Sequence, residues 1–181
     1  MNYTFLTDRL AVGDVASRSL PGFVAVVSLL SAERPGVICS ELGATLPQVP
    51  EGVPVHWIDL ADGEGPYLGP AHDRDGAAVP AHDLSDYLDE ATQFIADHIS
   101  KGAVLVHCGA GRSRSVAVVC AYLCRYVGMS WSEAINFVKQ RRPEAAPASC
   151  FHDAVTKWLR LDELAATGPR SSETVTTKEA P

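Results

Sequence analysis

The residues with the clearest chemical potential lie in one short stretch, His107-Cys108-Gly109-Ala110-Gly111-Arg112-Ser113-Arg114-Ser115. A cysteine ends an apolar run, small residues follow it, and an arginine and a serine close the stretch. Small residues let the chain curl so that successive backbone N–H groups converge into a site for an anion. An arginine grips two phosphate oxygens in a bidentate fork. The spacing therefore predicts a phosphate-binding loop in which Cys108 attacks phosphorus.

The segments on either side of this stretch predict how it is held. Val104–Val106 is a short apolar run, typical of a strand that is covered on both faces. Val116–Val127 is apolar almost all round, which predicts a buried helix. At such a strand-to-helix junction the first helical turn leaves N–H groups unpaired, and this end of the helix favours anions and thiolates. A buried structural cysteine in the same turn is the competing interpretation.

The rest of the chain predicts an α/β fold, a single domain with a central mixed sheet covered by helices. Strands are expected within Thr4–Val12, over Phe23–Leu29 and over 53–60. Later segments predict helices: an apolar stripe from Leu84 to Ile99, a capping box at Ser130–Glu133 that opens a helix, and a last helix from about Ser149 to Leu164.

Composition limits the class of protein. The 181 residues are 46% hydrophobic and 20% charged, as in ordinary globular domains. We expect a catalytic domain over residues 1–165 and a disordered tail over 166–181. No secretory signal, membrane span or basic stripe for nucleic acid is evident. The five cysteines show no CxxC spacing, which argues against a disulfide framework or a zinc site and favours the cytoplasm.

The stretch HCGAGRSRS resembles the HCxxGxxRS signature of the cysteine-dependent phosphatases, and its ending is similar to that of the dual-specificity branch. LAVGDVASRSL and INFVKQRRPEAAP also look like elements of that family, and the resemblance covers roughly Tyr3 to Leu161. The low-molecular-weight tyrosine phosphatases carry their cysteine near the N-terminus, where this chain has none. The resemblance implies a dual-specificity-phosphatase-like fold and hydrolysis of phosphotyrosine and phosphoserine/threonine, with no cofactor and no metal.

The resemblance also implies a role for each residue of the stretch. Cys108 is expected to form a phosphocysteine intermediate, and Ser115 to help its sulfur leave. Arg114 is expected to bind the phosphoryl group and stabilise the transition state. His107 is expected to order the loop from behind, with an ordinary core histidine as the alternative. The phosphate-binding residues are expected to be Gly109, Ala110, Gly111, Arg112, Ser113 and Arg114.

A proton donor for the leaving group is still needed. In the family this donor is an aspartate on a loop after an upstream strand, and Asp62 matches that place. Asp59 is the main rival, one residue out of phase with Asp62 along the strand. Asp73 and Asp75 are expected on a surface loop. Residues 63–82 look like an insertion behind the acid, since the separation from Cys108 is longer than the family usually shows.

Several alternatives stay open. Arg112 is a second base in the loop, which favours doubly anionic substrates such as a lipid or small-molecule phosphate. The acidic residues between Asp59 and Glu90 favour basic peptides instead. Cys39 either forms a disulfide with Cys108 under oxidation or packs in the core. Arg141-Arg142-Pro143 fits a helix C-terminus better than a docking patch. A non-catalytic phosphate-binding module and a sulfurtransferase are the competing classes of function.

Overall fold

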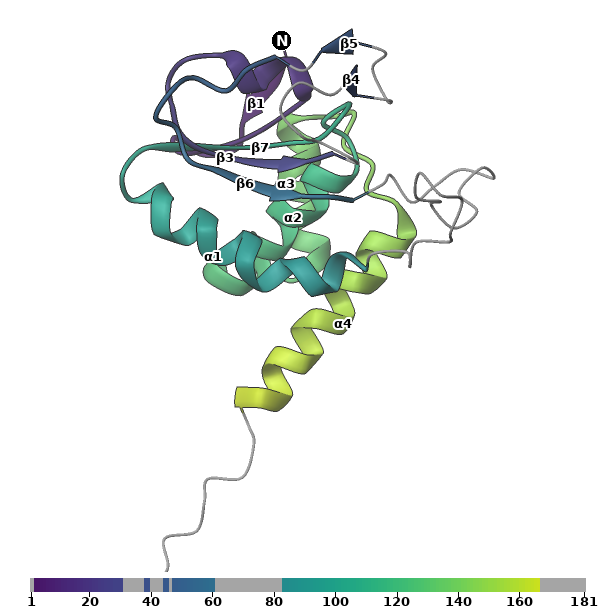
Figure 1. The fold of residues 1–181 in the computed structure, drawn as a ribbon. Helices are drawn as coiled ribbons and strands as arrows, with labels where there is room; N and C mark the ends of the chain where they lie inside the picture. The colour runs from purple at the N-terminus through teal and green to yellow at the C-terminus, as the bar shows by residue number, and fades with distance from the viewer. Residues whose placement is uncertain (1, 31–37, 40–43, 46, 61–82, 167–181) are drawn as a thin grey trace, which may run out of the picture.

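The computed structural model describes residues 2–30, 38–39, 44–45, 47–60 and 83–166. Their centre is a five-stranded sheet in the order β1-β2-β7-β3-β6, beside a short separate pair, β4-β5. Figure 1 shows the sheet edge-on with the helices gathered below it. The strands are β1 (Tyr3–Phe5), β2 (Leu10–Gly13), β3 (Phe23–Leu29), β4 (Ile38–Cys39), β5 (Ala44–Thr45), β6 (Val55–Ile58) and β7 (Ala103–His107).

Strand β7 occupies the middle of the sheet. It runs parallel to β2 on one side and to β3 on the other, while β6 is parallel to β3 and β1 is antiparallel to β2. The predicted mixed sheet is therefore confirmed. Side chains alternate along β7, so that Val104 and Val106 join the core under the helices while Leu105 joins a smaller cluster on the opposite face.

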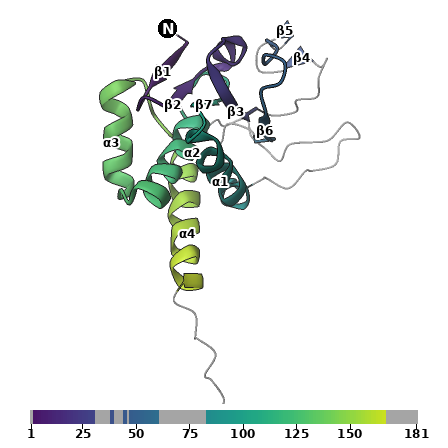
Figure 2. The same cartoon turned by 90° about the vertical axis from the view of Figure 1, so that its left-hand side faces the viewer.

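The helices form the second layer. α1 and α2 pack on the sheet, α3 and α4 pack against α2, and η1 contacts β2 and β7. Figures 1 and 2 place η1 on the side of the sheet away from these helices. The segments are η1 (Val15–Ser19), η2 (Leu84–Tyr87), α1 (Leu88–Ile99), α2 (Arg114–Tyr122), η3 (Leu123–Val127), α3 (Trp131–Arg141) and α4 (Ser149–Ala166).

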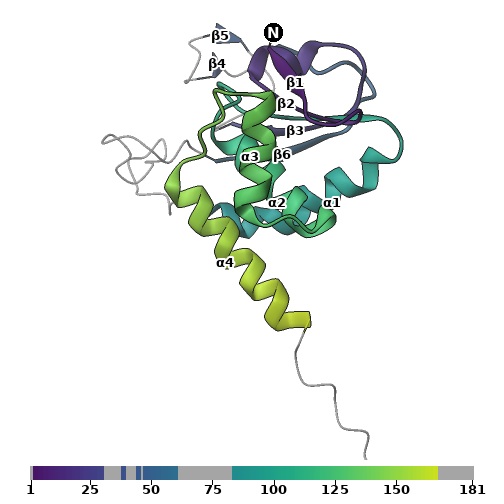
Figure 3. The same ribbon diagram turned by 180° about the vertical axis from the view of Figure 1, so that it is seen from behind.

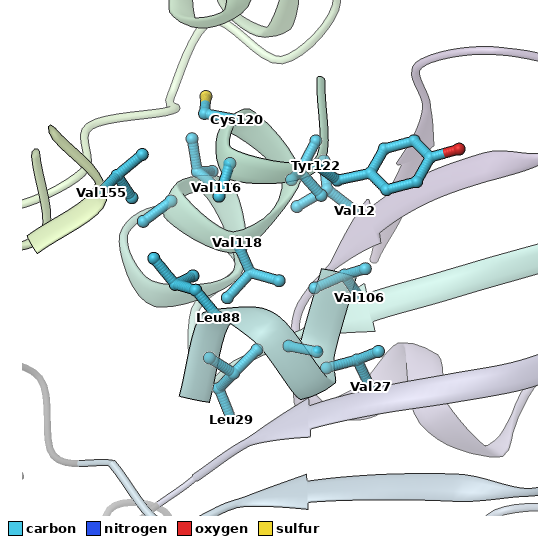
Figure 4. Packing of buried hydrophobic residues seen from close by; sticks show 14 of the residues in the cluster. Val12, Val27, Leu29, Leu88, Val106, Val116, Val118, Cys120, Tyr122 and Val155 are labelled. Atoms are coloured by element: carbon cyan, nitrogen blue, oxygen red, sulfur yellow. The ribbon is translucent and has the colours of Figure 1, made fainter. Parts of the chain in front are cut away.

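Helix α2 is buried along its whole length, as its uniformly apolar sequence predicts. Figure 4 shows Val106 of β7, Leu88 of α1 and Val155 of α4 on different sides of it. The prediction that the helix stays buried as far as Val127 is wrong for its last residues. η3 is a π-helical turn that carries Tyr126 (39% exposed) and Val127 (55% exposed) beyond the core before Gly128 ends it with φ +79°.

The remaining predictions of helices hold with one difference. The stripe from Leu84 begins as a 3-10 turn, η2, whose cap Asp83 accepts from the Ser85 N–H, and becomes α-helical only at Leu88. The capping box at Ser130 and Glu133 is present, and α4 begins at Ser149 as predicted. Figure 3 shows α4 projecting from the body. The predicted loop over 61–82 lies outside the described residues, as does nearly all of the predicted tail (167–181).

Within the described ranges, every helix is too short or too polar to span a lipid bilayer.

Candidate active site

The stretch singled out in the sequence forms the connection between β7 and α2. We call Cys108–Ser113 the phosphate loop. It leaves the carboxyl end of the central strand, between two parallel neighbours, and leads into the first turn of α2 at Arg114. In open α/β sheets this edge is where ligands bind, and the N-terminus of the following helix favours an anion. The predicted location at a strand-to-helix junction is therefore confirmed.

The carbonyl groups of the phosphate loop are held from outside it. The Gly109 carbonyl accepts from the Val15 N–H at 3.2 Å, and the Arg112 carbonyl accepts from the Ala146 N–H at 2.8 Å. Between them, the Gly111 carbonyl accepts from Arg142 Nε at 2.7 Å, and the Ala110 carbonyl accepts from Arg142 Nη2 at 3.5 Å.

These four bonds orient the N–H groups of the loop. In a trans peptide the C=O and the following N–H point in opposite directions, and the described residues contain no cis peptide bond. The N–H groups that follow these carbonyls therefore point away from the supporting segments. They belong to Ala110, Gly111, Arg112 and Ser113. Successive N–H groups that are held in this way are suited to bind an anion, which fits the phosphate-binding loop that the sequence predicts.

Gly111 is the tightest point of the phosphate loop. Its φ is +66°, a left-handed conformation that other residues rarely adopt. A Cβ on Gly111 would lie 2.4 Å from the Gly13 carbonyl oxygen and 2.8 Å from Arg142 Nη2. The Cys108 N–H also donates to the Gly13 carbonyl, at 3.4 Å. The loop is thus pressed between the end of β2 and an arginine, and glycine is required at 111.

Cys108 is fully buried, and its Sγ lies 3.3 Å from Ser115 Oγ in the first turn of α2. A hydroxyl at this distance can donate a hydrogen bond to a thiolate. Ser113 has a different role, because its Oγ accepts from the Ala148 N–H at 3.2 Å and ties the loop to the segment before α4. The geometry thus brings together the cysteine and serine that the sequence pairs.

Arg114 is buried (1% exposed), and its Nη1 donates to the Leu60 carbonyl at 2.9 Å. This bond joins the start of α2 to the chain just after β6. The segment on which the proton donor is expected therefore reaches the phosphate loop at Leu60, two positions before Asp62. Asp62 itself lies outside the described residues, as do Asp73 and Asp75. Asp59 is described and exposed. Burial raises the pKa of Tyr87, and the charge of Asp59 acts in the same direction.

His107 is buried without exposed surface, and neither ring nitrogen has a hydrogen-bond partner among the described residues. Burial, together with the nearby positive charge of Arg18, lowers the pKa of His107 to about 3. The imidazole is therefore neutral at physiological pH and is unsuited to shuttle a proton. It lies one residue before Cys108, on the face of β7 away from the helices. Its predicted role in ordering the loop stays a prediction.

Of two other predicted residues, the structure describes the side chain of Arg112 but not that of Cys39. Arg112 is exposed, and its Nε donates to the Glu144 carbonyl at 3.3 Å, so its guanidinium stays near the surface of the loop. Cys39 ends β4, but its side chain lies outside the described residues. Its proposed disulfide with Cys108 stays a prediction.

Arg142 was missed as a site residue. The sequence assigns it to the basic end of a helix, yet it is buried (4% exposed) and bonded to the phosphate loop. Its burial is a tertiary feature, because 31 positions separate Arg142 from Gly111. Two signals were available. Arg142 lies in INFVKQRRPEAAP, the segment that looks like a family element, and the proline at 143 disfavours a longer α3.

Comparisons with known proteins agree with this geometry. The family model described as "Dual specificity phosphatase, catalytic domain" matches residues 67–160. The chain is 50% identical over 66 residues to dual specificity protein phosphatase 1B of Arabidopsis thaliana, covering 36% of this chain and 40% of that protein. It is 36% identical over 101 residues to dual specificity protein phosphatase 16 of Homo sapiens, covering 51% of this chain and 15% of that protein.

Among solved structures, the chain is similar to human DUSP28, with a TM-score of 0.67 and 25% identity. The match covers 90% of this chain and 96% of that one. The similarity therefore extends over nearly the whole fold. The matched segments cover less than half of each curated relative, 40% of the Arabidopsis protein and 15% of the human one.

Proposed function

Because the chain belongs to the dual-specificity phosphatase family, we propose that it hydrolyses phosphate monoesters of tyrosine and of serine or threonine through a phosphocysteine intermediate. The observation that carries the proposal is the phosphate loop itself. In this loop Cys108 Sγ lies beside Ser115 Oγ, and the buried Arg114 stands at the start of α2. The loop carbonyls are bonded to residues outside the loop, so the N–H groups that follow them face the other way.

In the first step the Cys108 thiolate attacks phosphorus. An S–P bond forms and the P–O bond to the leaving group breaks, in line with the attack. The N–H groups of the loop and the Arg114 guanidinium stabilise the equatorial oxygens, on which negative charge is spread. The departing oxygen takes a proton from an aspartic acid, for which Asp62 is our assignment and Asp59 the rival.

In the second step a water molecule attacks the phosphocysteine. The same aspartate, now ionised, takes a proton from this water, the O–P bond forms and the S–P bond breaks. Ser115 donates a hydrogen bond to the departing sulfur, which supports its release as a thiolate. The products are inorganic phosphate and the free enzyme. No step requires a metal or a cofactor.

A lipid or small-molecule phosphate is the second candidate substrate. The exposed guanidinium of Arg112, held at the surface of the phosphate loop by Glu144, favours a second anionic group near the reacting phosphate. We keep phosphorylated protein as the primary assignment, because the named curated relatives are dual specificity protein phosphatases.

The same reasoning extends to location and domain limits. A mechanism that needs a free thiol suits a reducing compartment, so we place the protein in the cytoplasm. We assign the catalytic domain to residues 1–165, with 166–181 as an appended tail.

The test compares the native chain with Cys108→Ser and Cys150→Ser, without metal and with reductant. The second variant is a matched control, because Cys150 is an exposed cysteine at the start of α4. Phosphotyrosine peptide, phosphothreonine peptide and a phosphoinositide are supplied in parallel. We expect hydrolysis of both peptides, abolished by Cys108→Ser and kept by Cys150→Ser.

Other outcomes change the assignment. Preference for the phosphoinositide would favour the second candidate substrate. A native chain that binds phosphate but hydrolyses none of the three would support a non-catalytic phosphate-binding module.

A further inference from the structure

A single buried arginine connects three separate parts of the chain to the phosphate loop. Arg142 follows the last residue of α3, and its own N–H donates to the Val138 carbonyl at 2.8 Å. Its Nη1 donates to Thr4 Oγ1 on β1 at 3.1 Å. Its Nε and Nη2 donate to the carbonyls of Gly111 and Ala110.

The partners of this guanidinium are unusual for a buried charge. A buried arginine normally needs a carboxylate, because removing its charge from water is costly. Among the described residues, the carboxylate that pairs with Arg142 is that of Glu144, whose Oε1 lies 3.3 Å from Nη1. That side chain is 47% exposed, so the ion pair is weak. The planar fork is instead directed at two consecutive carbonyls of the phosphate loop, a geometry that a lysine cannot reproduce.

These contacts constrain the two peptide groups at the centre of the phosphate loop. The Ala110 carbonyl shares a peptide plane with the Gly111 N–H, and the Gly111 carbonyl shares one with the Arg112 N–H. Holding the carbonyls therefore aims both N–H groups at the anion. We infer that Arg142 is a positioning residue that preorganises the phosphate loop for the phosphoryl group from its outer side. The inference rests on the proposed function, because it assigns that anion to the phosphate of the substrate.

Packing around Gly111 supports preorganisation rather than a flexible loop. The space that a Cβ would need at Gly111 is taken by the Gly13 carbonyl and by Arg142 Nη2. The central peptide of the loop is thus wedged between β2 and the guanidinium. Dipoles that are already oriented stabilise a developing charge without reorganisation during the reaction.

The chain offers a matched control in the preceding residue. Arg141 is exposed; its guanidinium lies over the Phe137 ring, 3.9 Å from the centroid, and its Nη1 donates to the Phe137 carbonyl. Substituting Arg141 removes the same charge as substituting Arg142, from the neighbouring position, but removes no contact with the phosphate loop.

The experiment compares Arg142→Met, Arg142→Lys, Thr4→Val and Arg141→Met with the native chain. Inorganic phosphate binding is measured by calorimetry. Alkylation of Cys108 by iodoacetate and by iodoacetamide is followed by peptide mass. Both reagents react with the thiolate, but only iodoacetate is an anion. The ratio of their rates therefore reports how well the phosphate loop binds an anion, and not how much of Cys108 is ionised.

We expect Arg142→Met to raise the phosphate Kd by about tenfold or more, the loss of at least one charge-assisted hydrogen bond. The iodoacetate-to-iodoacetamide ratio is expected to fall by a similar factor. Arg142→Lys is expected to recover thermal stability more than phosphate affinity. Thr4→Val is expected to weaken phosphate binding by about two- to threefold, because the guanidinium keeps its loop contacts. Arg141→Met is expected to match the native chain in both readouts.

Native phosphate affinity and a native alkylation ratio in Arg142→Met would overturn the inference, whatever its melting temperature. If Arg142→Met does not fold, phosphate affinity and the alkylation ratio are measured in Arg142→Lys instead. Native values of both in that variant would overturn the inference. A native chain that binds phosphate without hydrolysing any ester would contradict the proposed function but leave the positioning role standing, because neither readout depends on turnover.

Discussion

At the scale of single residues, the Cys108–Ser115 contact leads to a prediction about the second chemical step. Ser115→Ala removes the hydroxyl that lies 3.3 Å from the sulfur. A hydrogen bond to a charged group contributes about 1.5–3 kcal/mol, so we expect breakdown of the phosphocysteine to slow by roughly 10- to 100-fold. Stopped-flow hydrolysis of p-nitrophenyl phosphate should then show a burst followed by a slow steady rate.

The control for Ser115→Ala is Ser132→Ala, an exposed serine in the first turn of α3. It should leave both phases unchanged. Equal slowing of the burst and of the steady rate in Ser115→Ala would argue against a role in sulfur release.

The identity of the proton donor is also tested by single substitutions. Asp62→Asn should lower kcat on an alkyl phosphate such as phosphoserine by roughly 10²–10⁴-fold, because an alkoxide leaves poorly without a proton. The limb of the pH–rate profile that reports this acid should disappear. Asp59→Asn provides the comparison, and a larger loss there would transfer the assignment from Asp62.

At the scale of elements, α4 is fastened to α1 and η3 by one carboxylate. Asp89 on α1 pairs with Arg125 of η3 and accepts from Trp158 Nε1 of α4 at 3.1 Å, while Arg125 lies over the Trp158 ring. The bond from Arg125 holds the pKa of Asp89 below its ordinary value. Asp89 is 70% exposed, so solvent screens the pair strongly.

We therefore expect Asp89→Asn to lower the free energy of unfolding by only about 1 kcal/mol in urea titrations. Because the folded-state pKa of Asp89 is lowered, its contribution is present above the ordinary value of 3.8 and is lost as pH falls below it. Asp97→Asn on the same helix, whose carboxylate accepts from the exposed Gln93, should change stability less. An equal effect of both substitutions would contradict the network.

At the scale of the whole molecule, stability should depend on pH through a buried histidine. The pKa of His107 is about 3 in the folded protein and 6.5 in an ordinary setting. Between these values the unfolded chain binds a proton that the folded chain does not, so stability decreases as pH falls below 6.5. Burial lowers the pKa of His56 as well, which acts in the same direction.

The expected slope from His107 is about 1.4 kcal/mol per pH unit, so about 2 kcal/mol should be lost between pH 6.5 and pH 5. Urea unfolding at a series of pH values measures it. His107→Asn should reduce this dependence of stability on pH, while His152→Asn, at a half-buried position on α4, should keep the native slope. A native slope in His107→Asn would show that another group is responsible.

Which parts of the structure the sequence predicts depends on the range of the interactions involved. The β3 strand, the capping box and the loop between β7 and α2 follow from local patterns: β-branched runs, a serine-to-glutamate spacing, and small residues between two apolar segments. The π-helical η3 was not predicted, because the apolar pattern continues through Val127 while the core ends near Cys124.

The sequence alone predicted the chemistry that we propose, because a cysteine, an arginine and a serine stand within one loop and the start of one helix. The residues that support the loop could be identified only from the tertiary structure. Val15, Arg142 and Ala146 are distant in sequence and meet the loop carbonyls only when η1, the end of α3 and the segment before α4 pack around β7 and α2. No local sequence pattern predicts these contacts. An arginine at the end of a helix has the same sequence context whether its guanidinium is exposed to water or donates to the carbonyls of a phosphate loop.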